Sequence, residues 1–135
     1  WRAPTRMPNT RRALEAAEWV RVHHRDAAAA LHAALFDAHF AAGRALDDPD
    51  VIDDLVSRSG APVDEVRDAL EDGRASALVE ASMDAARAAG VSSTPTWVLD
   101  DGFTIPGALD AATVHRWVSK VVARADAGGT ASRPA

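Results

Sequence analysis

The chain has 135 residues, a net charge of −5 at pH 7 and no cysteine. This length suits one domain of ordinary size, and no apolar run approaches the about 20 residues that a membrane-spanning helix needs. The lack of cysteine excludes a disulfide scaffold and a thiolate metal site. The acidic balance argues against a general attraction for phosphate. We therefore expect no nucleic-acid partner and no membrane partner, and we place the protein in the cytoplasm.

Helix signals dominate the chain as far as Gly90. Asn9 and Thr10 are suitable N-caps, and Asp48 followed by Pro49 is a cap with proline at the first helical position. Apolar residues at helical spacing predict five helices, over 11–25, 26–42, 49–59, 62–71 and 74–89. The expected buried faces include Leu14, Trp19, Val20, Val22, Leu31, Leu35, Phe36, Phe40, Ile52, Leu55, Val66 and Met83.

After Gly90 the hydrophobic period changes. Thr96–Leu99 and Phe103–Ile105 predict two short strands, and Asp100–Gly102 between them predicts a hairpin turn. Asp110 then caps a last helix that ends near Ala125, with a buried face of Val114, Trp117, Val118, Val121 and Val122. Residues 127–135 have the composition of a disordered tail.

The predicted hairpin poses a physical problem. A two-stranded hairpin is marginally stable alone, and a strand that is apolar on both faces, such as 97–99, belongs inside a covered sheet. The chain offers no other convincing strand, although Trp1–Ala3 could be the remnant of one. We expect either that further strands precede Trp1, since the first methionine is Met7, or that a second copy supplies an edge, which makes a homodimer a candidate state.

The segment from Val91 to Asp100, together with Gly107-Ala108 further along the chain, resembles the C-terminal half of a thioredoxin fold of the DsbA-like family. That family includes the FrnE-type proteins and the 2-hydroxychromene-2-carboxylate isomerases. The upstream helical stretch is similar to the helical insertion of the FrnE branch, and it carries the motifs Pro8-Asn9-Thr10, Leu35-Phe36-x-x-x-Phe40, Gly43-Arg44 and Asp48-Pro49-x-Val51.

The resemblance implies an α/β, thioredoxin-like fold with a large α-helical insertion, which is mostly helical in the part present, with about six helices and one β-hairpin. Four segments follow: a remnant of strand and linker over 1–9, the helical insertion over 10–90, the C-terminal thioredoxin-fold half over 91–126 and the tail over 127–135. The Cys-x-x-Cys segment of the family would precede Trp1. The implied activity of the intact protein is thiol–disulfide oxidoreduction.

The resemblance also implies a substrate site. The Thr94–Pro95 bond would be cis, and this loop, bordered by Ser93 and Trp97, would receive a peptide or thiol substrate. Threonine before the proline departs from the valine common in DsbA-type oxidases, which leaves the substrate preference open. Because thiol exchange needs a thiolate, no catalytic residue lies in this chain. We expect no cofactor, except glutathione if the protein belongs to the isomerase branch; a cysteine-free binding or assembly module is the other alternative.

Other candidate sites are weaker. His32 and His39 lie seven residues apart with Asp37 nearby, but no His-Glu-x-x-His motif is present, so we predict no metal site. His39 is expected at the boundary of the core. The acidic residues from Asp47 to Asp54 lack the spacing of a calcium loop and predict a solvated helix start. Trp97 and Trp117 are expected in the core rather than on a stacking platform.

Overall fold

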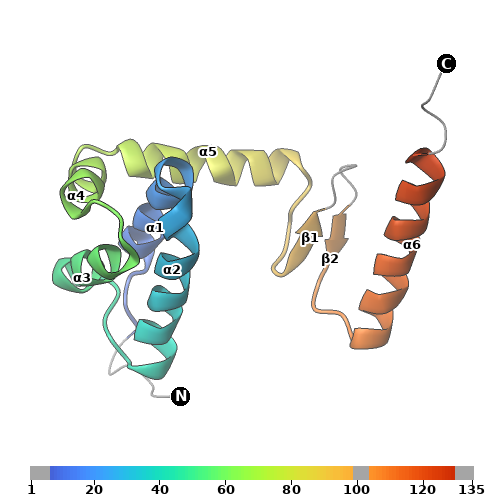
Figure 1. Cartoon of the computed structure of the whole chain (residues 1–135), viewed down its shortest axis with the longest axis horizontal. Helices are drawn as coiled ribbons and strands as arrows, with labels where there is room; N and C mark the ends of the chain where they lie inside the picture. Colours follow the sequence, from blue (N-terminus) through green and yellow to red (C-terminus); the bar gives the residue numbers. More distant parts are fainter. Residues whose placement is uncertain (1–6, 99–103, 130–135) are drawn as a thin grey trace. The chain divides into compact units, whose positions relative to one another are not determined.

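The computed structural model describes residues 7–98 and 104–129. Six α-helices and a two-stranded antiparallel sheet make up this part of the chain, as the sequence predicts (Figure 1). The chain divides into two units, Trp1–Ala85 and Ala86–Ala135. In chain order the elements are α1 (Arg11–His23), α2 (Arg25–Phe36), the π-helix η1 (Asp37–Ala41), α3 (Pro49–Ser59), α4 (Val63–Glu71), α5 (Arg74–Ala88), β1 (Thr96–Val98), β2 (Thr104–Pro106) and α6 (Ala111–Gly129).

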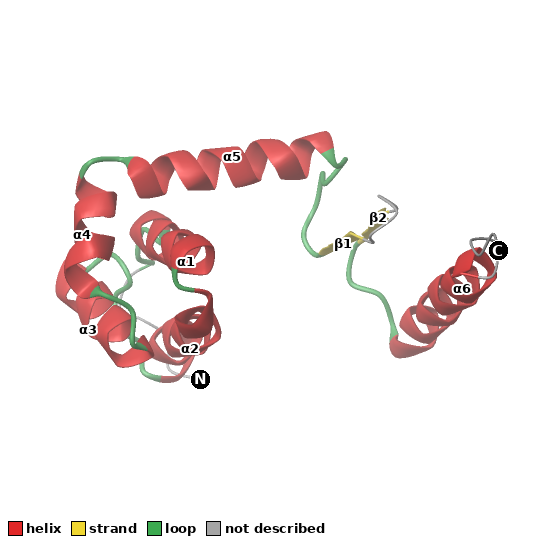
Figure 2. Ribbon diagram, turned by 45° about the horizontal axis from the view of Figure 1, so that its top comes forward, coloured by secondary structure: helices red, strands yellow, loops and turns green. Residues whose placement is uncertain are grey.

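The first unit is built from α1 to α4, η1 and most of α5, and Figure 2 shows these helices in red. Helix α1 contacts α2, α3 and α4, and α2 contacts α3. The apolar sides of these helices meet in one core, whose largest fully buried side chains are Leu31, Ile52, Leu55, Val20, Val56 and Val66. Burying a side chain of this size contributes about 1.5–3 kcal/mol, so this core is the main source of stability of the helical unit.

Local sequence determines where these helices begin and end. The Asp48 carboxylate accepts a hydrogen bond from the Asp50 N–H at 3.0 Å, and Pro49 follows as the first helical residue of α3. Gly60 ends the same helix with φ +86°, a left-handed conformation that favours glycine. At α1, Thr10 occupies the N-cap position without a side-chain cap hydrogen bond, and the Asn9 side chain accepts from the Arg11 N–H at 3.0 Å instead.

The second predicted helix is divided in the structure. Residues 26–42 were expected to form one α-helix, but α2 ends at Phe36 and continues as the π-helix η1. The Ala42 N–H donates to the Asp37 carbonyl at 2.9 Å, an i→i+5 bond that widens the last turn. This change of period alters which residues face the core after Phe36, a shift that hydrophobic spacing alone does not predict.

Ion pairs tie the helices of the first unit together. Arg11 on α1 contacts Glu15 at 2.6 Å and Glu80 on α5 at 2.8 Å. Arg67 on α4 contacts Asp53 on α3 at 2.7 Å. These pairs lie at the surface, where each contributes about 0–1 kcal/mol, so they orient the helices more than they stabilise them.

The second unit contains the hairpin and α6. Strands β1 and β2 pair antiparallel, with Trp97 opposite Ile105 and Val98 opposite Thr104. Helix α6 begins after Asp110, whose carboxylate accepts from the Thr113 N–H at 2.9 Å, and this hydrogen bond holds the pKa of Asp110 below its usual value. The helix continues to Gly129, beyond the predicted end near Ala125. Along the described residues, no helix combines the length and the apolar character needed to cross a bilayer.

Several predicted parts lie outside the described residues. These are the strand remnant Trp1–Ala3, the turn Asp100–Gly102 with Leu99 and Phe103 beside it, and residues 130–135 of the tail.

Candidate functional site

The loop that precedes β1 contains the predicted substrate residues. Its Thr94–Pro95 peptide bond is cis. Two hydrogen bonds hold the loop: the Gly107 N–H donates to the Pro95 carbonyl at 2.7 Å, and the Thr96 hydroxyl donates to the Ser93 carbonyl at 2.5 Å. The first bond connects the loop to the residue that follows β2. The backbone around Pro95 is therefore positioned by the hairpin.

The side chains of this loop face solvent. Ser93, Thr94 and Pro95 are exposed, and Trp97 has 54% of its surface exposed. The four predicted residues thus lie together in one short, accessible segment. Their role in binding stays a prediction.

Strand β1 has an open edge next to this loop. Among the described residues it pairs with β2 alone. A strand with an unpaired edge can accept an extended polypeptide, whose main chain then completes the hydrogen-bond ladder. The loop offers hydroxyl and indole side chains to an extended peptide, and the open edge of β1 can pair with one further strand.

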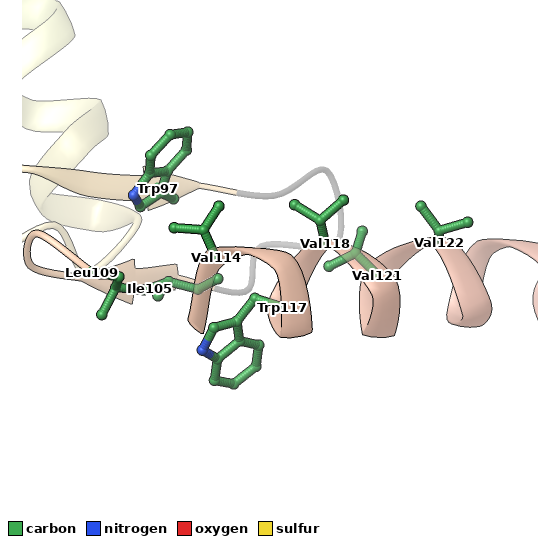
Figure 3. Close-up of a pocket in the computed structure, with 8 residues that line it drawn as sticks. All are labelled: Trp97, Ile105, Leu109, Val114, Trp117, Val118, Val121 and Val122. Atoms are coloured by element: carbon green, nitrogen blue, oxygen red, sulfur yellow. The ribbon is translucent and has the colours of Figure 1, made fainter. Parts of the chain in front are cut away.

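A small apolar pocket lies between the hairpin and α6 (Figure 3). Its volume is about 130 Å³, and the described side chains that line it are all apolar. Figure 3 shows Val114, Val118 and Val122 pointing to the same side of α6. The lining residues are Trp97, Ile105, Leu109, Val114, Trp117, Val118, Val121 and Val122.

This apolar face is covered much less than the sequence predicts. Trp97 and Val98 were expected in the interior of a sheet, but 54% and 52% of their surfaces are exposed. Val118 and Val122 were expected to be buried, and their exposed fractions are 55% and 52%. The physical reason is that only two strands are present in the described part of the chain, so most of the α6 face has no sheet against it.

The histidines make contacts that need no metal. His24 Nε2 lies 3.0 Å from Glu65 Oε1, and the His23 ring lies 4.0 Å from the Trp19 ring. His39 is half-buried, as expected for the core boundary, with its ring 4.6 Å from Phe40. Within the described residues there is no cluster of three or more acidic or histidine side chains suited to a metal ion.

The helical unit carries an apolar groove that the sequence analysis missed. Leu14, Phe36 and Phe40 were expected in the core, but between 47% and 55% of each side chain is exposed. Met83 and Val22, also expected to be buried, are exposed as well. The first three residues line a groove of about 380 Å³ together with His32 and His39. Their spacing is the only sequence signal, and it does not distinguish the edge of an apolar stripe from its centre.

The chemistry of the loop is limited to the groups that it exposes. The loop offers hydroxyls, backbone groups and an indole, but the chain has no thiol. A helical block that precedes a hairpin and a final helix in the chain agrees with a thioredoxin-like protein that carries a helical insertion.

Comparison with protein families identifies the class. The model of the DSBA-like thioredoxin domain matches residues 2–118, and the chain therefore belongs to this family. No curated protein and no solved structure matches the chain. The family assignment confirms the thioredoxin-like fold predicted from residues 91–108.

Proposed function

We propose that the intact protein is a FrnE-like thiol–disulfide oxidoreductase in which these residues supply the substrate-binding surface and a segment outside them supplies the redox cysteines. The observation that supports this most strongly is the match to the DSBA-like thioredoxin domain over residues 2–118. The chain itself has no cysteine, so it cannot carry out the exchange alone.

The proposed reaction is a reversible exchange between two dithiol–disulfide pairs. A substrate thiolate attacks one sulfur of the enzyme disulfide, forms a mixed disulfide and releases the other enzyme sulfur as a thiolate. The second substrate thiolate then attacks the mixed disulfide, which releases the oxidised substrate. The substrate loses two electrons and two protons, and the enzyme disulfide is reduced to a dithiol.

In this proposal the loop from Ser93 to Trp97 positions the substrate. An extended peptide pairs with backbone groups near Thr94 and Pro95, and the exposed Trp97 indole contacts one of its side chains. Such pairing brings a substrate cysteine to a fixed distance from the enzyme sulfur, and this positioning accelerates the exchange.

The uncovered face of the second unit supports the proposal of a further segment. Val118 and Val122 on α6 expose about half of their surfaces. A strand that pairs with the open edge of β1 would also cover the adjacent face of α6. We propose that the segment carrying the cysteines does this in the intact protein.

Single-turnover oxidation of a dithiol peptide tests the proposal. The protein purified from its native cells is oxidised, mixed with the peptide and quenched with an alkylating reagent. We expect peptide oxidation with the native protein and none with the 135-residue chain. Glutathione-dependent isomerisation without peptide oxidation would instead identify the isomerase branch, and the absence of both activities would favour the binding module.

A pair of neighbouring variants tests the loop. Trp97→Ala removes an exposed aromatic side chain, while Val98→Ala truncates a residue with nearly the same exposure on the other face of β1. Loss of about 1 kcal/mol of aromatic contact raises KM roughly fivefold for Trp97→Ala with kcat unchanged. Val98→Ala should leave KM within twofold of wild type, as a rough limit for a surface change. Equal effects of the two variants would refute the role of Trp97.

A further inference from the structure

Helix α6 carries a row of positive charges. Arg116, Lys120 and Arg124 recur at every fourth position. Residues four apart lie on the same face of a helix, so these three form a ridge about 12 Å long at the ~1.5 Å rise per residue. We call this set the basic ridge. The stretch from Ala111 to Arg124 contains no carboxylate, in a chain whose net charge is −5.

Among the described residues, the cations of the basic ridge lack the carboxylate partners that several arginines of the helical unit have. Arg11, Arg44 and Arg67 contact carboxylates of other helices at 2.7–2.8 Å. The basic ridge forms no ion pair with the side chains that the structure describes, and all three residues are exposed. Arg116 donates to the Thr113 hydroxyl at 2.9 Å, which is a neutral acceptor. The positive charge of the ridge is therefore available to a partner.

An aromatic ring lies beside the basic ridge. The Lys120 ammonium is 5.3 Å from the centre of the Trp117 ring. These two residues and Arg124 line a hollow of about 460 Å³ with Val121 and Ala123. Figure 3 shows the Trp117 ring on the other side of α6 from Val118 and Val122. The hollow borders the apolar face of the helix, with which it shares Trp117 and Val121, and it combines cations with an apolar floor.

We propose that the basic ridge binds an acidic polypeptide segment in an extended conformation. Successive cations are about 6 Å apart along the helix axis. In an extended chain, side chains on the same side recur every second residue, about 6.6 Å apart. Carboxylates at alternate positions therefore match the three cations in sequence, and an apolar side chain of the segment contacts Trp117.

Two features favour a short acidic segment over other anionic partners. The net charge of −5 repels a polyanion such as nucleic acid or an anionic bilayer at long range. A segment with only a few carboxylates responds to the field within about 10 Å at 0.1 M salt, where the basic ridge dominates. In addition, the cations follow only the Trp117 side of the apolar face, whereas His115 and Ser119 occupy the other border. A helix that lies in a membrane surface instead has a broad cationic face opposite its apolar face.

This inference goes beyond the proposed oxidoreductase function and does not depend on it, because it involves no thiol. The full 135-residue chain is titrated into a fluorescein-labelled short peptide with aspartates at alternate positions, and anisotropy gives the Kd. Matched peptides carry asparagine in place of aspartate, or the same aspartates in one consecutive block. Phosphatidylserine vesicles and an oligothymidine replace the peptide in two further arms.

The variants distinguish the effect of the basic ridge on peptide affinity from the effect of the overall charge of the protein. R116Q/K120Q/R124Q removes the ridge, and Arg25→Gln removes an exposed cation from α2. Circular dichroism checks that each variant keeps the wild-type helix content. If the triple variant loses helix, the single variant Lys120→Gln and the salt dependence of wild-type binding replace it.

We expect the alternating peptide to bind about tenfold more tightly than the asparagine peptide, since each of three exposed ion pairs adds roughly 1.4- to 5-fold in affinity. The triple variant should lose about tenfold and Arg25→Gln less than about twofold, and salt should weaken binding. Equal binding of the acidic and neutral peptides would overturn the proposal. Stronger binding to the vesicles or to the oligothymidine, or equal binding of the block peptide, would also contradict it.

Discussion

The helical unit should respond very differently to the same substitution at two leucines. Leu31 on α2 has 1% of its surface exposed, whereas Leu14 on α1 has 55% exposed. Leucine to alanine in a closed core costs about 2–5 kcal/mol, because the lost transfer energy is increased by the cavity left behind. We therefore expect Leu31→Ala to lower the free energy of unfolding by about 3 kcal/mol.

Leu14→Ala is the matched control. About half of this side chain is already in water, so only about half of the 1.5–3 kcal/mol for full burial is at risk. No enclosed cavity forms at an exposed groove, and alanine is the better helix former. The expected loss is about 1 kcal/mol or less, which leaves a difference of about 2 kcal/mol between the two variants.

Urea denaturation of the full chain measures this difference. With a slope of about 1–3 kcal/mol per molar urea, the midpoint of Leu31→Ala should fall about 1 M below that of Leu14→Ala. Hydrogen exchange of the α2 amides reports the helical unit separately from α6. Equal midpoints for the two variants would refute the assignment of Leu31 to the core and Leu14 to the groove.

Two further predictions concern the N-cap of α3 and the loss of stability at acidic pH. Asp48→Ala removes the N-cap of α3 and should lower the free energy of unfolding by about 0.5–2 kcal/mol. Asp48→Asn keeps a hydrogen-bond acceptor, so its urea midpoint should stay close to that of the wild type. Equal destabilisation by the two substitutions would contradict the capping role of Asp48. The hydrogen bonds from His24 and Trp19 hold the pKa of Glu65 below its usual value. This carboxylate therefore contributes stability above its unfolded pKa, and the contribution disappears as the pH falls through its folded pKa. The effect is small because 42% of the Glu65 side chain is exposed. In Glu65→Gln the melting temperature should change less with pH below about pH 4.5 than in the wild type. The same pH dependence in both proteins would contradict the hydrogen bonds assigned to the Glu65 carboxylate.

The two ends of α3 could be predicted because they depend on local chemistry. Asp48, Pro49 and Gly60 determine the two ends of α3 through hydrogen bonds and backbone conformation that involve only nearby residues. Burial was harder to predict, since it depends on which elements meet. Phe36 lies on an apolar stripe of the sequence, but it lines an exposed groove where α2 changes to the π-helix.

In the candidate site, too, the local structure could be predicted from the sequence and the burial could not. The sequence of residues 93–97 predicts a loop followed by a strand, and the structure places these side chains together in solvent. The burial expected for Trp97 and Val98 did not follow, because a strand is buried by neighbouring strands and one segment of sequence does not specify them. The basic ridge was also missed, because its three cations are separated by apolar residues and become adjacent only on the helix.

We propose that the intact protein has a thioredoxin-type redox centre whose cysteines lie outside these residues. The most direct measurement is the intact mass of the protein from its native cells, before and after reduction and alkylation. We predict a mass above the 14.2 kDa of this chain and the addition of two alkyl groups only after reduction. A mass equal to that of this chain, with no alkylation, would contradict the claim.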